Sequence, residues 1–231
     1  MILAEAATDV FGVRSGMSPM FEPAAIFGYA IDMSSAAEDN LTSVRDYLSG
    51  EATAKRKHEY VDGVIYAMVG ASNSHNRIAT NATGSLHSQL RGKPCEVFNS
   101  DTKVRVRTQR ETRFYYPDCL VVCHPNPPGD SFQDDPAVII EVLSESTRRV
   151  DEFEKRDAYL SIPRLSVYVL LEQSTAVAGV YRRADNGFKR EIYRGMDATI
   201  DLPEVGCRLP LADAYDRVEF IPRPADEEAS G

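Results

Sequence analysis

Residues 114–144 contain two apolar segments that each carry one acid: FYYPDCLVV at Phe114–Val122 holds Asp118, and AVIIEVLS at Ala137–Ser144 holds Glu141. Runs this rich in β-branched and aromatic residues predict buried strands. An ionised carboxylate inside a buried strand is costly unless a cation or a set of hydrogen-bond donors satisfies it. The two segments therefore predict two core strands whose acids need a partner.

A shared divalent cation would satisfy both acids. Neighbouring strands lie about 4.8 Å apart, and Mg²⁺ prefers one or two carboxylates together with water. Such an ion would lower the pKa of a bound water and offset charge on a phosphoryl oxygen. Two structural alternatives stay open: Asp118 could accept backbone N–H bonds at a strand start, and Glu141 could pair with an arginine.

Composition limits the class of protein. The chain has 231 residues, 43% of them hydrophobic and 26% charged, which is typical of a globular protein. Its formal net charge of −9 argues against an indiscriminate nucleic-acid coat but leaves room for a local basic groove. We expect an irregular N-terminal arm at residues 1–40, one domain at residues 41–221 and an acidic tail at residues 222–231.

The four cysteines show neither paired CxxC spacing for zinc nor the density of a disulfide scaffold. Cys119 and Cys123 fall in or beside the first apolar segment, where we expect small buried thiols. No apolar run reaches membrane-span length, and no basic segment precedes an apolar stretch at the N-terminus. The sequence thus favours a soluble protein of a reducing compartment, the cytoplasm.

Two segments before the apolar strands carry candidate site residues. Asp62-Gly63 is the two-residue turn signal of a β-hairpin, and Glu59 lies just before it. Ser72, Asn73 and Ser74 could each cap a helix that runs to about Leu90, with His75 on its first turn. Glu59 could be a solvated edge charge and His75 a local hydrogen-bonding group, or both could face a site. The helix would bury one apolar stripe: Ile78, Ala82, Leu86 and Leu90.

Basic residues alternate with valines at 103–107. If this segment is a strand, Lys103, Arg105 and Arg107 share one face. That face could simply be solvated, or it could contact nucleic-acid phosphates without reading bases. The following loop, residues 123–136, contains three aspartates whose spacing does not match a calcium loop, so we expect them to be solvated: Asp130, Asp134 and Asp135.

A helix is predicted at about residues 150–160. Asp151, Lys155 and Tyr159 follow one another at i,i+4 positions and so lie on one face. Asp151 and Lys155 could form an exposed pair of little energetic value. Alternatively, Lys155 could neutralise charge on an attacking hydroxide or on a phosphate.

Taken in order, these motifs resemble the Uma2-like family of endonucleases (DUF820), within the PD-(D/E)XK nuclease superfamily. The resemblance spans about residues 41–215. It rests on the following residues: Glu59-Tyr60-Val61-Asp62-Gly63, Ser74-His75, Tyr116-Pro117-Asp118, Ile140-Glu141-Val142-Leu143-Ser144, Ser146-Thr147, Lys155 and Tyr159.

The resemblance implies a restriction-endonuclease-like α/β core, in which helices flank a mixed β-sheet that carries an additional β-hairpin region. It also implies hydrolysis of DNA phosphodiester bonds with Mg²⁺ or Mn²⁺. Asp118 and Glu141 then match the metal-binding acids, and Glu59 matches an acid from the N-terminal part of the core. The superfamily's lysine usually lies two residues after the second acid, where this chain has Leu143. Lys155 on the following helix fits that role instead.

Three functions follow for testing. The first is a metal-dependent DNA endonuclease with Glu59, Asp118, Glu141 and Lys155 as catalytic residues, and His75 and Tyr159 lining the site. A homodimer is expected by analogy, because two sites cut two strands. The second, motivated by Leu143 and the net charge, is an inactive nuclease-fold module that binds nucleic acid or a protein. The third is hydrolysis of another phosphoester, for which neutralising the basic strip would matter little.

Overall fold

The structure, a computed structural model, describes residues 41–108, 111–144 and 148–220. The expected arm and acidic tail lie outside these residues, as do Ser146 and Thr147. The chain divides into two compact units, Met1–Met68 and Val69–Gly231, which are described separately. Among the described residues no helix has both the length and the apolar character needed to cross a membrane.

The described part of the first unit is a short helix with a β-hairpin. It consists of α2 (Val44–Glu51), β1 (His58–Val61) and β2 (Val64–Ala67). Asp62 and Gly63 join the two antiparallel strands with φ angles of 49° and 94°. Both angles are positive, as a type I′ turn requires, so the predicted hairpin is confirmed.

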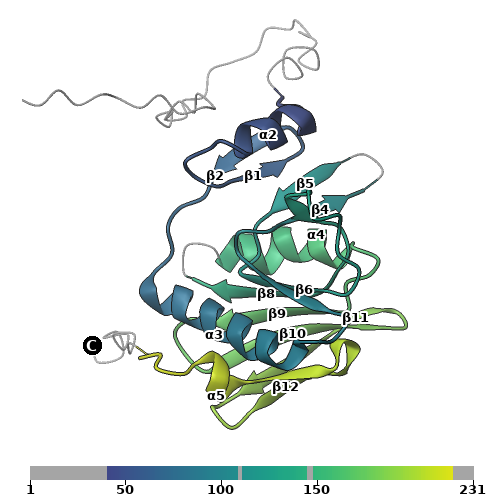
Figure 1. Cartoon of the computed structure of the whole chain (residues 1–231). Coiled ribbons are helices and arrows are strands. Elements are labelled where there is room, and N and C mark those ends of the chain that lie inside the picture. Colours follow the sequence, from purple (N-terminus) through teal and green to yellow (C-terminus); the bar gives the residue numbers. More distant parts are fainter. Residues whose placement is uncertain (1–40, 109–110, 145–147, 221–231) are drawn as a thin grey trace, which may run out of the picture. The chain divides into compact units, whose positions relative to one another are not determined.

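The second unit carries a mixed sheet and the helices around it (Figure 1). Its helical segments are α3 (Asn73–Leu90), the π-helical turn η1 (Val150–Lys155), α4 (Arg156–Leu160), the 3₁₀ turn η2 (Pro203–Val205) and α5 (Leu211–Ala214). Its strands are β3 (Glu96–Asn99), β4 (Lys103–Arg107), β5 (Thr112–Tyr115), β6 (Cys119–Val122), β7 (Phe132–Gln133), β8 (Pro136–Leu143), β9 (Val167–Glu172), β10 (Val177–Ala184), β11 (Gly187–Arg194), β12 (Thr199–Leu202) and β13 (Cys207–Pro210).

Six strands form the main sheet in the order β11-β10-β9-β8-β6-β3. Strands β8 and β9 pair in parallel, while the other neighbours are antiparallel. A parallel pair needs a crossover connection, and η1 with α4 supplies it. The sheet is therefore mixed and flanked by helices, which confirms the predicted fold class.

The two faces of this sheet have different partners. One face packs on α3, whose predicted stripe from Ile78 to Leu90 is buried together with Ile140 and Val169. Because side chains alternate along a strand, the other face carries Ile139 and Glu141. It is covered in part by the crossover, so that Glu141 is only 3% exposed.

The first apolar segment is two strands, not one. Phe114 and Tyr115 end β5, which pairs with β4, whereas Cys119–Val122 form β6 of the main sheet. The predicted single strand from 114 to 122 is thus wrong. Pro117 explains the break, since it lacks the backbone N–H that a ladder needs. The second segment is confirmed, because β8 covers Pro136–Leu143.

The expectation for Cys123 is also wrong. Cys123 forms a disulfide with Cys95, because the β3–β6 ladder pairs Glu96 with Val122 and so brings the next residues together. The spacing of 28 residues contains no local signal of this pairing. Cys119 is a buried free thiol, as expected, and burial raises its pKa to about 12.

Candidate active site

The two acids of the apolar segments lie opposite each other. Strand β6 pairs with β8 so that Cys119 faces Ile140, and one step outward Asp118 meets Glu141. Two hydrogen bonds link Asp118 to strand β8. The backbone N–H of Asp118 donates to Oε2 of Glu141 at 3.2 Å, and the backbone N–H of Val142 donates to Oδ2 of Asp118 at 2.7 Å. Ladder register therefore brings the acids together at one end of the sheet.

The crossover helix supplies a cation and a hydroxyl to Glu141. Nζ of Lys155 lies 3.6 Å from Oε1 of Glu141. The hydroxyl of Tyr159 donates to the same oxygen at 3.1 Å. Lys155 also lies 3.4 Å from Oδ1 of Asp151. Glu141 is thus paired with the lysine of the crossover.

The i,i+4 face predicted for this helix is buried. Asp151, Lys155 and Tyr159 are 3%, 7% and 0% exposed, so the alternative of an exposed Asp151–Lys155 pair is wrong. The segment is held in place from the sheet, because the hydroxyl of Tyr168 donates to the backbone carbonyl of Asp151 at 3.0 Å. Burial raises the pKa of Tyr168 well above its ordinary value, and the nearby charges of Glu141 and Asp151 add to the effect. Tyr168 therefore stays a hydrogen-bond donor.

His75 reaches the acids from the start of α3. The Oγ atom of Ser72 accepts a bond from the His75 backbone N–H and begins the helix there. Nε2 of His75 then lies 3.2 Å from Oδ2 of Asp118. Burial alone would lower the pKa of His75, but the hydrogen bond and the charge of Asp118 outweigh it and raise the pKa above the ordinary value. Protonated His75 can therefore act as a counter-ion of Asp118.

The acid pair suits a hard divalent cation. Two carboxylates on adjacent strands, completed by water, are the donor set that Mg²⁺ prefers. No group of three His, Cys, Asp or Glu side chains is arranged as a ready metal site in the part of the chain that the structure describes. Water or a substrate phosphate would therefore have to supply the remaining ligands.

Glu59 lies on β1 of the first unit, opposite Tyr66. It does not belong to the unit that contains Asp118 and Glu141. Its membership of the catalytic set stays a prediction.

The basic strip is a strand, as predicted, with Val104 and Val106 buried. Its cations have different surroundings. Lys103 is 5% exposed and donates to the hydroxyl of Tyr116 at 3.2 Å. Arg105 makes two bonds of 2.7 Å to Asp134. Only Arg107 of the three has a side chain more than half exposed, at 58%.

The expectation that Asp134 is solvated is therefore wrong. Besides Arg105, the side-chain amide of Asn126 donates to Asp134 at 3.1 Å. Burial alone would raise the pKa of Asp134, but the hydrogen bonds from Arg105 and Asn126 lower it below its ordinary value. The partners of this carboxylate are Arg105 on β4 and Asn126 in the loop itself. The spacing of aspartates within the loop could not predict the contact with β4.

Asp151 is a functional candidate that the sequence shows only as a partner of Lys155. In the structure it is a buried acid that holds the lysine near Glu141. The i,i+4 spacing was the available signal. The role of Tyr168 had no local signal, because its contact depends on how β9 lies under the crossover.

Comparisons with known proteins identify a family and two similar proteins. Residues 44–212 match the family model Uma2, described as "Putative restriction endonuclease". Two relatives from Synechocystis sp. (strain ATCC 27184 / PCC 6803 / Kazusa) are similar. "Uncharacterized protein slr1290" is 36% identical over 180 residues, covering 77% of this chain and 93% of the relative. "Uncharacterized protein sll1609" is 31% identical over 140 residues, covering 59% and 78%.

A solved structure shares the fold. It is a crystal structure of "a putative nuclease belonging to DUF820" from Anabaena variabilis ATCC 29413, with a TM-score of 0.59 and 16% identity. The similarity covers 74% of this chain and 96% of that one. Together with the family match over most of the described residues, it shows a nuclease fold. The chain belongs to the Uma2 family.

Proposed function

We propose that this protein is a divalent-metal-dependent endonuclease that hydrolyses phosphodiester bonds of DNA. The observation that carries the proposal is the position of Lys155, whose Nζ lies 3.6 Å from Glu141, while Asp118, directly before β6, is hydrogen-bonded to Glu141 and Val142. A buried lysine beside a pair of acids supplies the preorganised positive charge that phosphodiester hydrolysis needs. The family match and the shared fold support a nuclease.

Asp118 and Glu141 would hold Mg²⁺, or Mn²⁺ in its place. When bound, such an ion lowers the pKa of a coordinated water and offsets charge on a phosphoryl oxygen. The residues around the acids keep their oxygens in place. Val142 and His75 orient Asp118, and Tyr159 orients Glu141.

Lys155 would stabilise negative charge on the attacking hydroxide or on the phosphate. Its position takes over the role that a lysine two residues after Glu141 has in the superfamily, where this chain carries Leu143. The buried carboxylate of Asp151, 3.4 Å away, holds the Lys155 ammonium group beside Glu141. Glu59 would add a further acid, which orients water or completes the metal site. This is catalysis by positioning and preorganised charge.

An inactive nuclease-fold module that binds nucleic acid or protein is the second candidate. Leu143 favours it, because leucine can neither orient water nor stabilise charge. The two candidates differ in what they require of the acids, since only the enzyme needs Asp118 and Glu141 to bind a metal.

Calorimetric titration of Mg²⁺ and Mn²⁺ separates the candidates. We expect binding by the unmodified chain and none by Glu141→Gln. Glu154→Gln is the matched control, because Glu154 lies on the same crossover but contacts Tyr115 instead. A nuclease assay follows with Asp118→Ala and Glu141→Ala. If these variants cut DNA at the unmodified rate, the assignment of the acids is wrong.

Two copies would act together on duplex DNA, one on each strand. Light scattering during gel filtration tests this homodimer.

The cytoplasm is the cell compartment we propose for the protein. Thiol trapping in fresh cell extracts tests this location through the cysteines. Disulfides are rare in a reducing cytosol, whereas Cys95 and Cys123 are paired in the structure. Trapped thiols at both positions would support the cytoplasmic location, and a retained disulfide would contradict it.

A further inference from the structure

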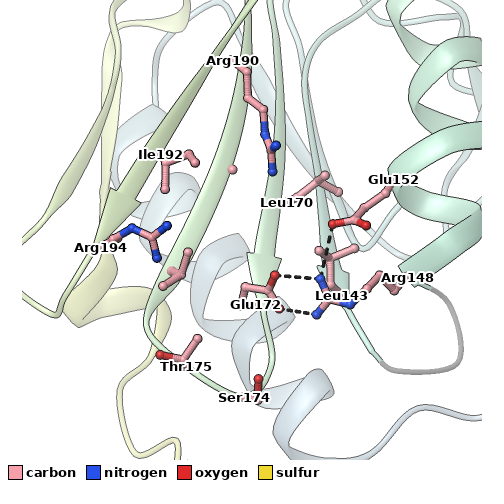
Figure 2. A pocket seen from close by; sticks show the side chains of 12 residues that line it. Leu143, Arg148, Glu152, Leu170, Glu172, Ser174, Thr175, Arg190, Ile192 and Arg194 are labelled. Atoms are coloured by element: carbon pink, nitrogen blue, oxygen red, sulfur yellow. Dashed lines mark hydrogen bonds and ion pairs between the residues drawn. The ribbon is translucent and has the colours of Figure 1, made fainter.

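A hollow of about 400 Å³ is shown in Figure 2. It lies on the sheet face that carries Glu141, since Glu141 pairs with Leu170 of its lining. It is lined by strands β8 to β11, by the turn after β9 and by the start of the crossover. The residues that shape it for this argument are Leu143, Leu170, Gly179, Arg190, Ile192 and Arg194.

Two arginines on β11 supply the positive charge of this hollow. Arg190 and Arg194 lie two residues on either side of Ile192, so all three point to one face of the strand (Figure 2). Both arginines are exposed. Neither has an acidic partner among the described residues; the guanidinium of Arg190 lies 5.8 Å from the centroid of the Tyr181 ring.

The acids that line the hollow already have a cation. Arg148 makes two bonds to Glu172, one of 2.8 Å, and a third to Glu152 at 3.3 Å (Figure 2). The bond with Glu172, together with the charges of both glutamates, raises the pKa of Arg148 above its ordinary value. Since these glutamates are occupied, the two β11 arginines can attract an anion, even in a chain with a net charge of −9.

Gly179 keeps the floor of the hollow open. It lies across the ladders from Leu170 and Ile192. A methyl group at Gly179 would lie 3.8 Å from Nη2 of Arg190 and 4.0 Å from Cβ of Leu170. The missing side chain therefore leaves room beside the guanidinium for a group of a ligand.

Strand register gives the separation between the hollow and the acid pair. Leu143 follows Glu141 by two residues on β8, which is about 7 Å along the strand. Across the sheet, Glu141 pairs with Leu170, Leu170 with Gly179 and Gly179 with Ile192. Three strand spacings separate Glu141 from Ile192, or about 14 Å. At the axial rise of B-DNA, about 3.4 Å for each nucleotide of one strand, this span is about four nucleotides.

We infer that this hollow binds a phosphodiester group of the nucleic-acid strand that is presented to Asp118 and Glu141, a few nucleotides from the bond between them. The inference rests on the proposed function and specifies its substrate contact. Arginine suits the role, because its planar guanidinium donates two parallel bonds to phosphate oxygens. Arg190 and Arg194 then position the backbone, and they do so without reading bases.

Fluorescence anisotropy with labelled single-stranded and duplex oligonucleotides tests this contact. The parent is the full chain with Glu141→Gln, so that DNA is not cut. Adding Arg190→Gln and Arg194→Gln should weaken binding about tenfold and lower the slope of log K against log salt by about 1.4 for a single strand or 1.8 for a duplex. Unchanged affinity and slope would overturn the inference.

The control pair removes the same charge elsewhere. Lys189 lies on β11 and, by alternation, on the opposite face from Arg190; Arg208 lies on β13. Both are exposed. Lys189→Gln with Arg208→Gln should leave both affinity and slope near those of the parent. An equal loss in this pair would show a general charge effect and overturn the site.

Gly179→Val tests the hollow itself at constant charge. The new side chain would occupy the space beside Arg190, so oligonucleotide binding should fall, whereas unchanged binding would place the phosphate elsewhere. Inorganic phosphate and a mononucleotide serve as competitors. If either competes as well as the oligonucleotide does, the hollow is a small-anion site and the inference fails. Metal binding by calorimetry, which needs no DNA, judges the acid pair separately.

Discussion

Strands β4 and β11 both carry basic residues at alternate positions, but their cations have different surroundings. On β4, Lys103 is buried beside Tyr116 and Arg105 is bound to Asp134. On β11, the exposed Arg190 and Arg194 have no acidic partner among the described residues. Alternation shows only that cations share a face. Whether that face can meet a phosphate depends on which loops and aromatic rings cover it.

Lys155 shows a third kind of surroundings for a basic side chain. Lys155 is as buried as Lys103, but its neighbours are the acids Glu141 and Asp151. One lysine thus contacts two acids, another packs beside a tyrosine, and two arginines are exposed. The following substitutions test whether these surroundings determine what each cation does.

The largest effect is expected at Lys155. Lys155→Met should lower the rate of DNA cleavage by about 10²–10³, the loss typical when one preorganised charge is removed from a reacting centre. Steady-state cleavage rates at saturating DNA measure it. Arg208→Gln, at an exposed position on β13 away from the acids, should leave this rate unchanged.

Removing Lys155 also leaves two buried carboxylates without their cation, so the variant must be shown to fold. Circular dichroism checks this, and Lys155→Arg supplies a charged replacement that should fold and retain part of the activity. Full activity in a folded Lys155→Met protein would contradict the role given to Lys155.

The next effect is on stability. Arg105→Gln should lower the free energy of unfolding by about 1.5–3 kcal/mol, since it removes two hydrogen bonds between charged groups. Arg190→Gln should change it by less than about 0.5 kcal/mol, as surface substitutions usually do. Urea unfolding compares the two. Equal losses would mean that the two strands do not differ as their contacts indicate.

A smaller effect on the free energy of unfolding is expected at His75, and its dependence on pH tests the role of this residue. Its pKa is raised in the folded chain beside Asp118. A raised pKa contributes stability that is fully present below the unfolded value of 6.5 and is lost as pH rises through the folded pKa.

The unfolding free energy of the unmodified chain should therefore exceed that of His75→Gln most below pH 6.5, and the excess should shrink as the pH rises above this value. Urea unfolding without divalent metal measures it. A difference that is constant across this range, or that grows with pH, would mean that His75 is not a protonated counter-ion of Asp118.

The smallest effect is expected at Arg107, the exposed member of the β4 strip. Its ion pair with Asp134 is long, at 3.5 Å, and its side chain is 58% exposed. Arg107→Gln should cost at most about 1 kcal/mol of stability. A fall in the salt slope of oligonucleotide binding by about 1 would show that β4 also contacts phosphate. An unchanged slope would confine that contact to other strands.

Local physics let the sequence determine several elements by itself. The stripe of α3 follows from helical periodicity, the hairpin at Asp62-Gly63 from the need for positive φ, and β8 from its β-branched run. The common face of Asp151, Lys155 and Tyr159 follows from i,i+4 spacing. Each depends on residues within a few positions of one another, so each could be predicted.

Tertiary structure alone decided the rest, because it depends on pairings between distant segments. The β6–β8 register places Asp118 opposite Glu141, and the parallel β8–β9 pair brings the crossover with Lys155 over them. Register also joined Cys95 to Cys123. Packing against Asp134 occupied Arg105, while β11 left Arg190 and Arg194 exposed. A sequence pattern states which side chains share a face, but only the folded chain determines what that face meets.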